Sequence, residues 1–289
     1  MRVLVTGASG MLGATLVPFL AADGHEVIRH GHVGASEVNC DLTDRLAVRA
    51  LVEANSPQAV VNLVALTNVD VCERELDRAY RLNVLTVENL VAALAGRGGA
   101  FLVQISTDQV YDAPGPNNEE NVRLTNIYAL TKYAGELAAK LMPSAVLRTN
   151  FFGPSRVRGR RSFSDWVLDE LRAGRPMTGF TDVIVNPVSM LTLSGMIGRV
   201  LERPVTGVFN IGSRGAMSKA DFIREAARLY GLSDAAMMPG LSTDAGLAAY
   251  RPKDMSMNCA RFETAFDVTL PRLSDEIAGL KRGGDDALQ

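Results

Sequence analysis

Cysteine, tryptophan and long apolar runs are all scarce in this sequence. Its 289 residues include 3 Cys and 1 Trp. The cysteines, Cys40, Cys72 and Cys259, are widely separated and lack the spacing of metal ligands, which predicts structural thiols in a reducing compartment and no metal site. No segment approaches the roughly 20 apolar residues that span a membrane, and the start, MRVLVTG, lacks the features of a signal peptide. We therefore expect a cytoplasmic protein with no membrane contact.

An excess of charge of either sign is also absent. The formal net charge is -2, so no global basic field attracts nucleic acid or an anionic membrane. The 47% of hydrophobic residues is ordinary for a globular protein and is enough for a sizeable core. One local basic group stands out, formed by Arg156, Arg158, Arg160 and Arg161. It is either a solvated loop or a site for a small anionic ligand.

Short apolar runs alternate with longer helical patterns along most of the chain. We predict strands at residues 2–6, 26–28, 36–40, 59–64, 101–107, 145–150 and 207–212. We predict helices at residues 11–22, 43–55, 73–94 and 218–230, and another that carries Tyr128. Continuous apolar strands that alternate with helices indicate an α/β fold, a doubly wound parallel sheet of the Rossmann type.

The regular alternation fades in two stretches. Pro, Gly and Arg become frequent at residues 151–179 and again after about residue 233. We therefore expect a dinucleotide-binding Rossmann domain at residues 1–150, with residues 180–232 returning to it. Residues 151–179 and 233–289 are expected to form a smaller, C-terminal substrate-binding lobe.

A glycine-rich loop, TGASGMLG, lies between the first predicted strand and the first predicted helix. Small residues at this place let the backbone turn sharply, approach a pyrophosphate and pack the helix tightly on the strand. The helix N-terminus then offers free N–H groups to the phosphates. A plain tight turn is the alternative. The predicted cofactor-binding residues of the loop are Gly7, Ser9, Gly10, Met11, Leu12 and Gly13.

The end of the second strand bears on the choice of cofactor. An acidic residue there commonly holds the ribose of NAD, whereas a basic one suits the extra phosphate of NADP. The sequence has Arg29, His30 and His32 and no acidic residue at this point. NADP(H) is therefore favoured over NAD(H), with an exposed polar turn as the alternative. Asp41 follows the third strand, where it can meet the adenine amino group.

The catalytic candidates follow the strand FLVQIST, where Thr107 and Asp108 lie at the edge that binds ligands in such sheets. Tyr128 lies near the start of the next helix, and Lys132 lies one turn further on the same face. An ammonium beside a phenol lowers the pKa of the phenol from about 10. Lys132 can also hold the nicotinamide ribose, and Thr107 can fix a substrate oxygen. The combination predicts reduction of a carbonyl.

Taken together, TGASGMLG, Asp41-Leu42, STDQVYD and YxxxK resemble the extended short-chain dehydrogenase/reductase superfamily over nearly the whole chain. More narrowly, the chain is similar to the dTDP-4-dehydrorhamnose reductases, which reduce a nucleotide-linked 4-keto-6-deoxyhexose. The segments that carry this narrower resemblance are TNVDVCERE (67–75), RLNVLTVENL, YALTKYAGE, LRTNFFGP and YRPKDMSMNCARFE (250–263).

The resemblance implies roles for individual residues. Tyr128 is the expected general acid, Lys132 its activator and Thr107 the hydroxyl that orients the substrate. The expected cofactor cleft includes Leu42, Ala65, Thr67 and Asn83, with Asn83 acting structurally near the lysine. A nucleotide-sugar substrate is expected to meet Asp108, Asn150 and Arg251, of which Arg251 suits the diphosphate.

Some positions depart from the branch. Gln109 and Tyr111 replace the first aromatic residue and the phenylalanine of STDYVFDG. Leu124 stands where a proline is common, and Ala129 where a glycine is common. The basic loop at residues 155–161 is also not typical of the branch. The reduction chemistry is unaffected by these changes, but the sugar is left open.

Three other functions use a related set of residues. A dehydratase of this superfamily carries Asp-Glu after the threonine, and here Gln109, which cannot exchange a proton, follows Asp108. An epimerase needs only the tyrosine and a retained NAD, against which Arg29 and His30 argue. The regulatory subunit of methionine adenosyltransferase is similar to the same branch and works through a partner. We expect the NADPH-dependent reductase, and leave open whether it forms a homodimer.

Overall fold

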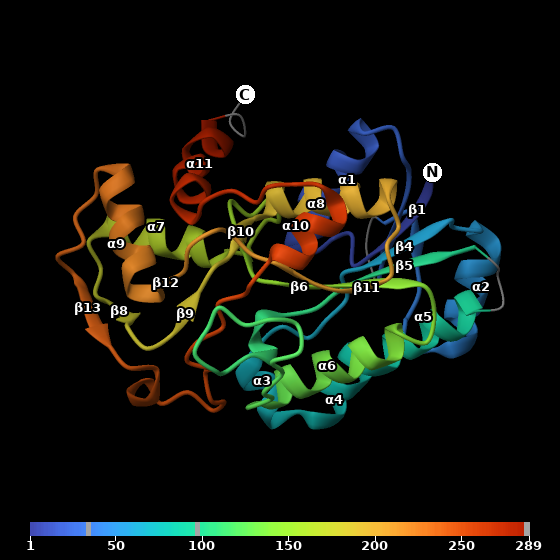
Figure 1. The fold of residues 1–289 in the computed structure, drawn as a ribbon, viewed down its shortest axis with the longest axis horizontal. Coiled ribbons are helices and arrows are strands. Elements are labelled where there is room, and N and C mark those ends of the chain that lie inside the picture. The colour runs from blue at the N-terminus through green and yellow to red at the C-terminus, as the bar shows by residue number, and fades with distance from the viewer. Residues whose placement is uncertain (33–35, 96–98, 286–289) are drawn as a thin grey trace.

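A seven-stranded parallel sheet forms the centre of the protein in the computed structural model, which describes residues 1–32, 36–95 and 99–285 (Figure 1). Its strands are β1 (Arg2–Thr6), β2 (Glu26–Gly31), β3 (Val38–Asn39), β4 (Ala59–Asn62), β5 (Phe101–Ile105), β6 (Ser144–Thr149) and β11 (Gly207–Ile211). Their order is β11-β6-β5-β4-β1-β2-β3, and every neighbouring pair is parallel. The predicted α/β doubly wound sheet is confirmed.

Helices cover both faces of this sheet (Figure 1). The helices on one face are α1 (Met11–Ala22), α8 (Met190–Glu202) and α10 (Ala260–Phe266), and those on the other are α2 (Arg45–Asn55), α5 (Thr86–Ala95) and α6 (Ile127–Ala139). Val3 and Val5 pack toward α1 and α8, whereas Leu4 packs toward α2 and α5. All three are fully buried, which explains why the strand is apolar throughout rather than alternating. No helix in the described ranges combines the length and the apolar character needed to cross a bilayer.

The strand order places a crevice above the middle of the sheet. β1 pairs with β2 on one side and with β4 on the other, so the chain reverses its direction of progress through the sheet at β1. In open α/β sheets, ligands bind outside the carboxyl ends of the strands at this point. The glycine-rich loop, which joins β1 to α1, lies at this edge.

The single long helix predicted at residues 73–94 is wrong. The chain there forms α3 (Val69–Arg74), α4 (Leu76–Tyr80), a π-helical turn η1 (Arg81–Leu85) and α5. Glu75 has a non-helical backbone, with φ -121° and ψ 67°, which separates α3 from α4. Within the π turn, the Asn83 side chain bonds the neighbouring loop at Leu66 rather than facing solvent. The strand predicted at residues 36–40 is also shorter than expected, since only Val38–Asn39 pairs with β2.

A second hydrophobic cluster lies beside the sheet, at the left of Figure 1. It joins α7 (Phe163–Ala173), β8 (Met177–Phe180), α9 (Lys219–Tyr230), β13 (Met237–Gly240) and α11 (Leu273–Asp285). Short strand pairs flank it: β7 (Phe151–Phe152) with β10 (Val188–Ser189), and β9 (Ile184–Val185) with β12 (Met217–Ser218). The sequence pattern missed α7, α8, α10 and α11. Helix α9 packs in this cluster, although it was expected within residues 180–232 of the Rossmann domain; the division into two domains stays a prediction.

A buried ion pair joins α6 to β6. Arg148 Nη2 lies 2.6 Å from Glu136 Oε2, and the two side chains are only 2% and 0% exposed. Ser106 donates a hydrogen bond to Glu136 Oε1 at 2.5 Å, and Arg148 donates to the Tyr111 hydroxyl at 2.8 Å. All the charge of the pair is therefore matched by partners within the protein, as burial of ions requires.

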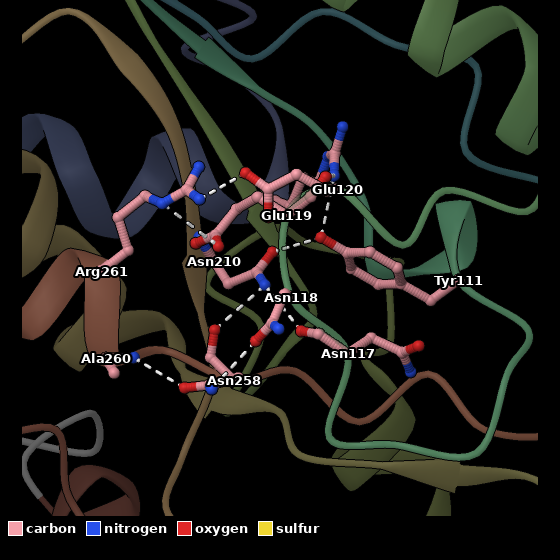
Figure 2. Close-up of polar contacts among 10 residues, drawn as sticks. Tyr111, Asn117, Asn118, Glu119, Glu120, Asn210, Asn258, Ala260 and Arg261 are labelled. Carbon is pink, nitrogen blue, oxygen red and sulfur yellow. Dashed lines mark hydrogen bonds and ion pairs between the residues drawn. The ribbon is translucent and has the colours of Figure 1, made fainter.

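The network continues from Tyr111 to the edge of the sheet (Figure 2). Tyr111 donates to Asn210 Oδ1 of β11 at 2.6 Å, and the Asn210 amide donates to the carbonyls of Asn117 and Asn258 at 3.0 and 3.1 Å. Arg261 of α10 extends the network through ion pairs with Glu119 and Glu120. The loop after β5 is thus fixed to β11 and to the chain that precedes α10.

Replacement of Arg148 by methionine should lower the free energy of unfolding by about 3–5 kcal/mol, because Glu136 would be left buried without its cation. Arg49→Met is the matched control. Arg49 pairs with Glu53 at 2.7 Å, but the two side chains are 70% and 54% exposed, so its loss should cost less than about 1 kcal/mol. Urea unfolding of both variants measures the difference, and equal losses would contradict it.

Candidate active site

A cavity of about 810 Å³ lies at the carboxyl edge of the sheet, above β1, β4, β5 and β6. Most of the residues predicted from the sequence line it: Gly7, Ser9, Gly10, Met11, Leu12, Gly13, His30, Asp41, Leu42, Ala65, Thr67, Thr107, Asp108, Tyr128, Lys132 and Asn150. Arg29, Asn83 and Arg251 are not among the lining residues. The structure thus brings the predicted cofactor loop and the predicted catalytic residues into one space.

The glycine-rich loop has a geometry that side chains would prevent. Gly7 has a φ of +68°, which favours glycine, and a Cβ on Gly13 would lie 2.5 Å from the carbonyl oxygen of Ala8. Gly10 caps α1 without any side-chain hydrogen bond. The first N–H groups of α1 therefore have no side-chain acceptor at the cap and face the cavity as donors for an anion. This arrangement fits a dinucleotide pyrophosphate.

Asp41 lies at the far end of the same cavity. Its Oδ1 accepts hydrogen bonds from the Thr43 amide and hydroxyl, both at 2.8 Å. These bonds lower the pKa of Asp41, so its carboxylate is an ionised acceptor at neutral pH. Arg81 donates to the Thr43 hydroxyl at 3.2 Å and lines the cavity. Arg81 lies in the π turn, which the sequence pattern did not reveal.

The basic residues at the end of β2 point in different directions. The Arg29 guanidinium lies 3.0 Å from Glu37 Oε1 in an ion pair that is about half exposed. His30 is buried, its Nε2 lies 3.1 Å from the carbonyl oxygen of Cys40, and burial lowers its pKa. Only His32 is both exposed and part of the cavity wall. His30 is thus a neutral ring in the wall rather than a cation.

Tyr128 and Lys132 lie on the first turns of α6. Asn126 caps the helix, because its Oδ1 accepts a hydrogen bond from the Ala129 amide at 2.8 Å. The Tyr128 hydroxyl shares a hydrogen bond with the Thr107 side chain. Lys132 Nζ donates to the carbonyl oxygen of Ile105 at 2.6 Å. Helix α6 and the end of β5 therefore place all three predicted catalytic side chains together.

The pKa of Tyr128 does not shift in the expected direction. Burial raises it, and the hydrogen bond with Thr107 opposes that rise only in part. Burial also lowers the pKa of Lys132 to about 8, against the opposing charge of Glu136. Desolvation is the largest influence on the pKa of Tyr128, and the Lys132 ammonium is bound to the carbonyl oxygen of Ile105 instead. Tyr128 is consequently fully protonated at neutral pH.

Asp108 follows Thr107 and is buried, with 3% of its surface exposed. Burial raises its pKa to about 6, although hydrogen bonds from Asn150 and Thr107 favour the ionised form. Asn150 Nδ2 donates to Asp108 Oδ2 at 2.8 Å, which joins the end of β6 to the end of β5. Asp108 and Asn150 both line the cavity.

The other two predicted residues outside the cavity wall act on its surroundings. Asn83 Oδ1 accepts from the Leu66 amide at 2.7 Å, and its Nδ2 donates to the Thr131 hydroxyl at 3.0 Å. Asn83 thereby holds the loop that carries Ala65 and Thr67 against α6. Arg251 Nη2 lies 2.6 Å from Asp70 Oδ2, and its Nη1 donates to the carbonyl oxygen of Ala249 at 2.8 Å. Its guanidinium is engaged within the protein.

Sequence reasoning missed part of the wall. The unpredicted lining residues include Cys40, Thr43, Asp77, Arg78, Arg81, Thr86, Gln109, Phe151 and Arg160. Arg160 belongs to the basic loop that the sequence marked as unusual. Asp77, Arg78 and Arg81 reach the cavity only because the expected long helix is broken before them, and nothing in the local sequence pattern indicates that break.

Comparison with known proteins decides the family. The RmlD substrate binding domain family matches residues 1–281. The dTDP-4-dehydrorhamnose reductase of Mycolicibacterium smegmatis is 35% identical over 238 residues, which is 77% of this chain and 67% of that protein. This chain belongs to the RmlD substrate binding domain family. The predicted membership of the extended short-chain dehydrogenase/reductases, and with it the class of NAD(P)-dependent oxidoreductases, is confirmed.

Two further similarities bear on the function of the protein. The crystal structure of a dTDP-4-dehydrorhamnose reductase from Clostridium acetobutylicum is 28% identical to this chain with a TM-score of 0.88, and the match covers 99% of this chain and 100% of that one. Methionine adenosyltransferase 2 subunit beta of Danio rerio is 26% identical over 274 residues, 91% of this chain and 84% of that protein. The family therefore holds proteins named as reductases and proteins named as subunits of another enzyme.

Replacement of Lys132 by methionine should alter the pH dependence of stability. The folded lysine has a pKa of about 8, below its ordinary value of 10.5. Between these values the unfolded chain binds more protons, so wild-type stability rises with pH relative to the variant, by about 3 kcal/mol in total. Urea unfolding from about pH 7 to pH 10 measures the change. Lys140→Met, at the exposed end of the same helix, should show no such trend; a parallel trend in both variants would contradict the prediction.

Proposed function

We propose that the protein is an NADPH-dependent reductase of a nucleotide-activated 4-keto-6-deoxysugar. The observation that carries the proposal is the meeting of Thr107, Tyr128 and Lys132 in the cavity that the glycine-rich loop also lines. A phosphate-binding loop beside a protonated phenol suits transfer of a hydride and a proton to a carbonyl. Family membership supports the same class of substrate.

The cofactor half of the cavity fits a dinucleotide. The N–H groups at the start of α1 bind the pyrophosphate, Asp41 accepts from the adenine amino group, and Lys132 holds the nicotinamide ribose. When bound, NADPH supplies the hydride for the C4 carbon. Leu42, Ala65 and Thr67 line the same half of the cavity and exclude water from it.

The substrate half supplies orientation and the proton. The Thr107 hydroxyl fixes the carbonyl oxygen, and Tyr128 gives that oxygen its phenolic proton. Because burial raises the pKa of Tyr128, the proton stays on the phenol until negative charge develops on the substrate oxygen, which is the behaviour required of a general acid. Asp108 and Asn150 offer acceptors and donors to the sugar hydroxyls.

Replacement of Tyr128 by phenylalanine removes the proton donor and leaves the ring. We expect the rate of NADPH oxidation with a nucleotide 4-ketosugar to fall about 100- to 10,000-fold, while the dissociation constant for NADPH stays within about twofold. A panel of dTDP- and UDP-linked 4-ketosugars, followed by loss of NADPH absorbance, provides the assay. Turnover that survives in this variant would refute the assigned acid.

The preference for NADPH depends on Arg29, which Glu37 holds in an exposed ion pair. Replacement of Glu37 by glutamine frees the guanidinium for the 2′-phosphate. We expect NADPH to bind about two- to fivefold more tightly in this variant, with NADH binding unchanged. Arg29→Met should weaken NADPH alone. Equal changes for both nucleotides would show that Arg29 does not meet the phosphate.

The similarity to methionine adenosyltransferase 2 subunit beta supports a second candidate, a cofactor-binding regulatory subunit. One measurement distinguishes this candidate from the reductase: tight NADP binding without turnover of any ketosugar in the panel favours the subunit. An epimerase is a third candidate, and it would retain NAD through purification. The nucleotide released from the purified protein can be identified by its mass. Retained NAD favours the epimerase, and its absence favours the reductase.

A further inference from the structure

Asp108 is a buried carboxyl that no cation contacts in the described part of the chain. The side chains that bond it, Asn150 and Thr107, are both neutral. Asp70 and Asp182, in contrast, each lie 2.6 Å from a basic side chain. Burial without a cation disfavours the carboxylate. The protonated carboxyl is therefore a state that the site has to accommodate.

The hydrogen bonds of Asp108 decide which of its oxygens carries the proton. Asn150 Nδ2 donates to Oδ2 at 2.8 Å, so Oδ2 is an acceptor. Oδ1 lies 3.2 Å from Thr107 Oγ1. When Asp108 is protonated, its proton therefore lies on Oδ1 and is donated to the Thr107 oxygen, and both carboxyl oxygens keep a partner.

The Thr107 hydroxyl can donate in only one direction at a time. It has one proton and two lone pairs, and the Gln109 amide donates to one of these lone pairs at 3.1 Å. When Asp108 is ionised, Thr107 donates its proton to Oδ1, and its second lone pair can accept from the Tyr128 hydroxyl. Both hydroxyl protons are then used within the protein.

Protonation of Asp108 reverses this pattern. The Asp108 O–H occupies the second lone pair of Thr107, so the proton of Thr107 is released into the cavity that Thr107, Asp108 and Tyr128 all line. Tyr128 loses its acceptor on Thr107 for the same reason. A carbonyl oxygen beside the two hydroxyls then accepts both protons, which stabilises the negative charge that hydride transfer creates on that oxygen.

The groups around Asp108 favour its protonated form. Burial is the largest influence and raises the pKa of Asp108 to about 6, whereas the charge of Lys219, at the start of α9, lowers it by a smaller effect. Tyr128 faces Asp108 from α6 as a protonated, neutral phenol, and Asn150 after β6 is neutral as well. NADPH and a nucleotide sugar both carry negative charge and exclude water, so their binding raises the pKa of Asp108 further.

We propose that Asp108 is a positioning residue that acts in its protonated form, in which it donates to Thr107 and so directs the Thr107 and Tyr128 hydroxyls to the carbonyl oxygen of the substrate. The inference rests on the proposed function. It adds a third proton to the two that contact the substrate, and it makes the state of one buried carboxyl the condition for both of them to be available.

The test follows kcat from about pH 5.5 to about pH 7.5, with NADPH and the 4-ketosugar that the wild type reduces fastest. This range lies below the pKa of about 8 for Lys132. Wild-type kcat should fall about 10- to 25-fold across it, because Asp108 ionises.

Asp108→Asn is the decisive variant. Its amide group can donate to Thr107 and accept from Asn150 at every pH, as the protonated carboxyl does. Its kcat should vary less than about twofold across the range and exceed that of the wild type at the upper end. Asp112→Asn is the matched control, because Asp112 is a buried acid of the same loop that does not line the cavity; it should keep the wild-type fall.

The outcomes separate this inference from the proposed function. A wild-type kcat without the fall, a fall that persists in Asp108→Asn, or a variant slower than the wild type at the upper end overturns the role of Asp108 while ketosugar reduction still stands. Absence of turnover with every ketosugar in the panel overturns the proposed function and the inference with it. Infrared difference spectra give a second measurement: the NADPH-bound wild type should show a protonated carboxyl band that fades toward the upper pH and is missing from Asp108→Asn. A band that is absent from the wild type at the lower pH also overturns the inference.

Discussion

The buried contact between Glu136 and Arg148 is the constraint on which the active site depends. Glu136 lies one turn after Lys132 on α6 and accepts from Ser106, the residue before Thr107. Arg148 belongs to β6, two residues before Asn150. A shift of α6 along the sheet would leave one of these charges buried and unmatched, which costs several kcal/mol. The relative position of the phenol, the ammonium and the threonine is therefore set by a pair that does not itself touch the cavity.

The parts of the site that come from neighbouring residues could be predicted from the sequence. The glycine-rich loop and the pairing of Tyr128 with Lys132 depend on local spacing, and both were predicted with the correct local structure. The partner of Arg251 could not be predicted, because Asp70 and Arg251 lie far apart in the sequence. The pKa of Tyr128 shifted against expectation for a similar reason: desolvation depends on everything that covers a side chain, whereas the sequence shows only its neighbours.

The make-up of the hydrophobic cluster beside the sheet explains why two of its helices, α7 and α11, were missed. Its core is assembled from segments before and after the last strand of the sheet, so α7 and α11 each carry only a narrow apolar face. Short strand pairs such as β7 with β10 contain too few residues to show a pattern.

The π-helical turn at Arg81–Leu85 has a consequence for the phase of the surrounding helices. A π turn contains one residue more than an α-helical turn would use, and each residue of an α-helix advances the side chains by about 100°. The extra residue sets Asn83 toward Leu66 while α5, immediately after it, still directs Leu90 and Leu94 into the core. One continuous segment thus directs Asn83 to the loop beside the cavity and Leu90 and Leu94 into the core. Insertion or deletion of one residue between them would rotate Asn83 relative to the two leucines by about 100°.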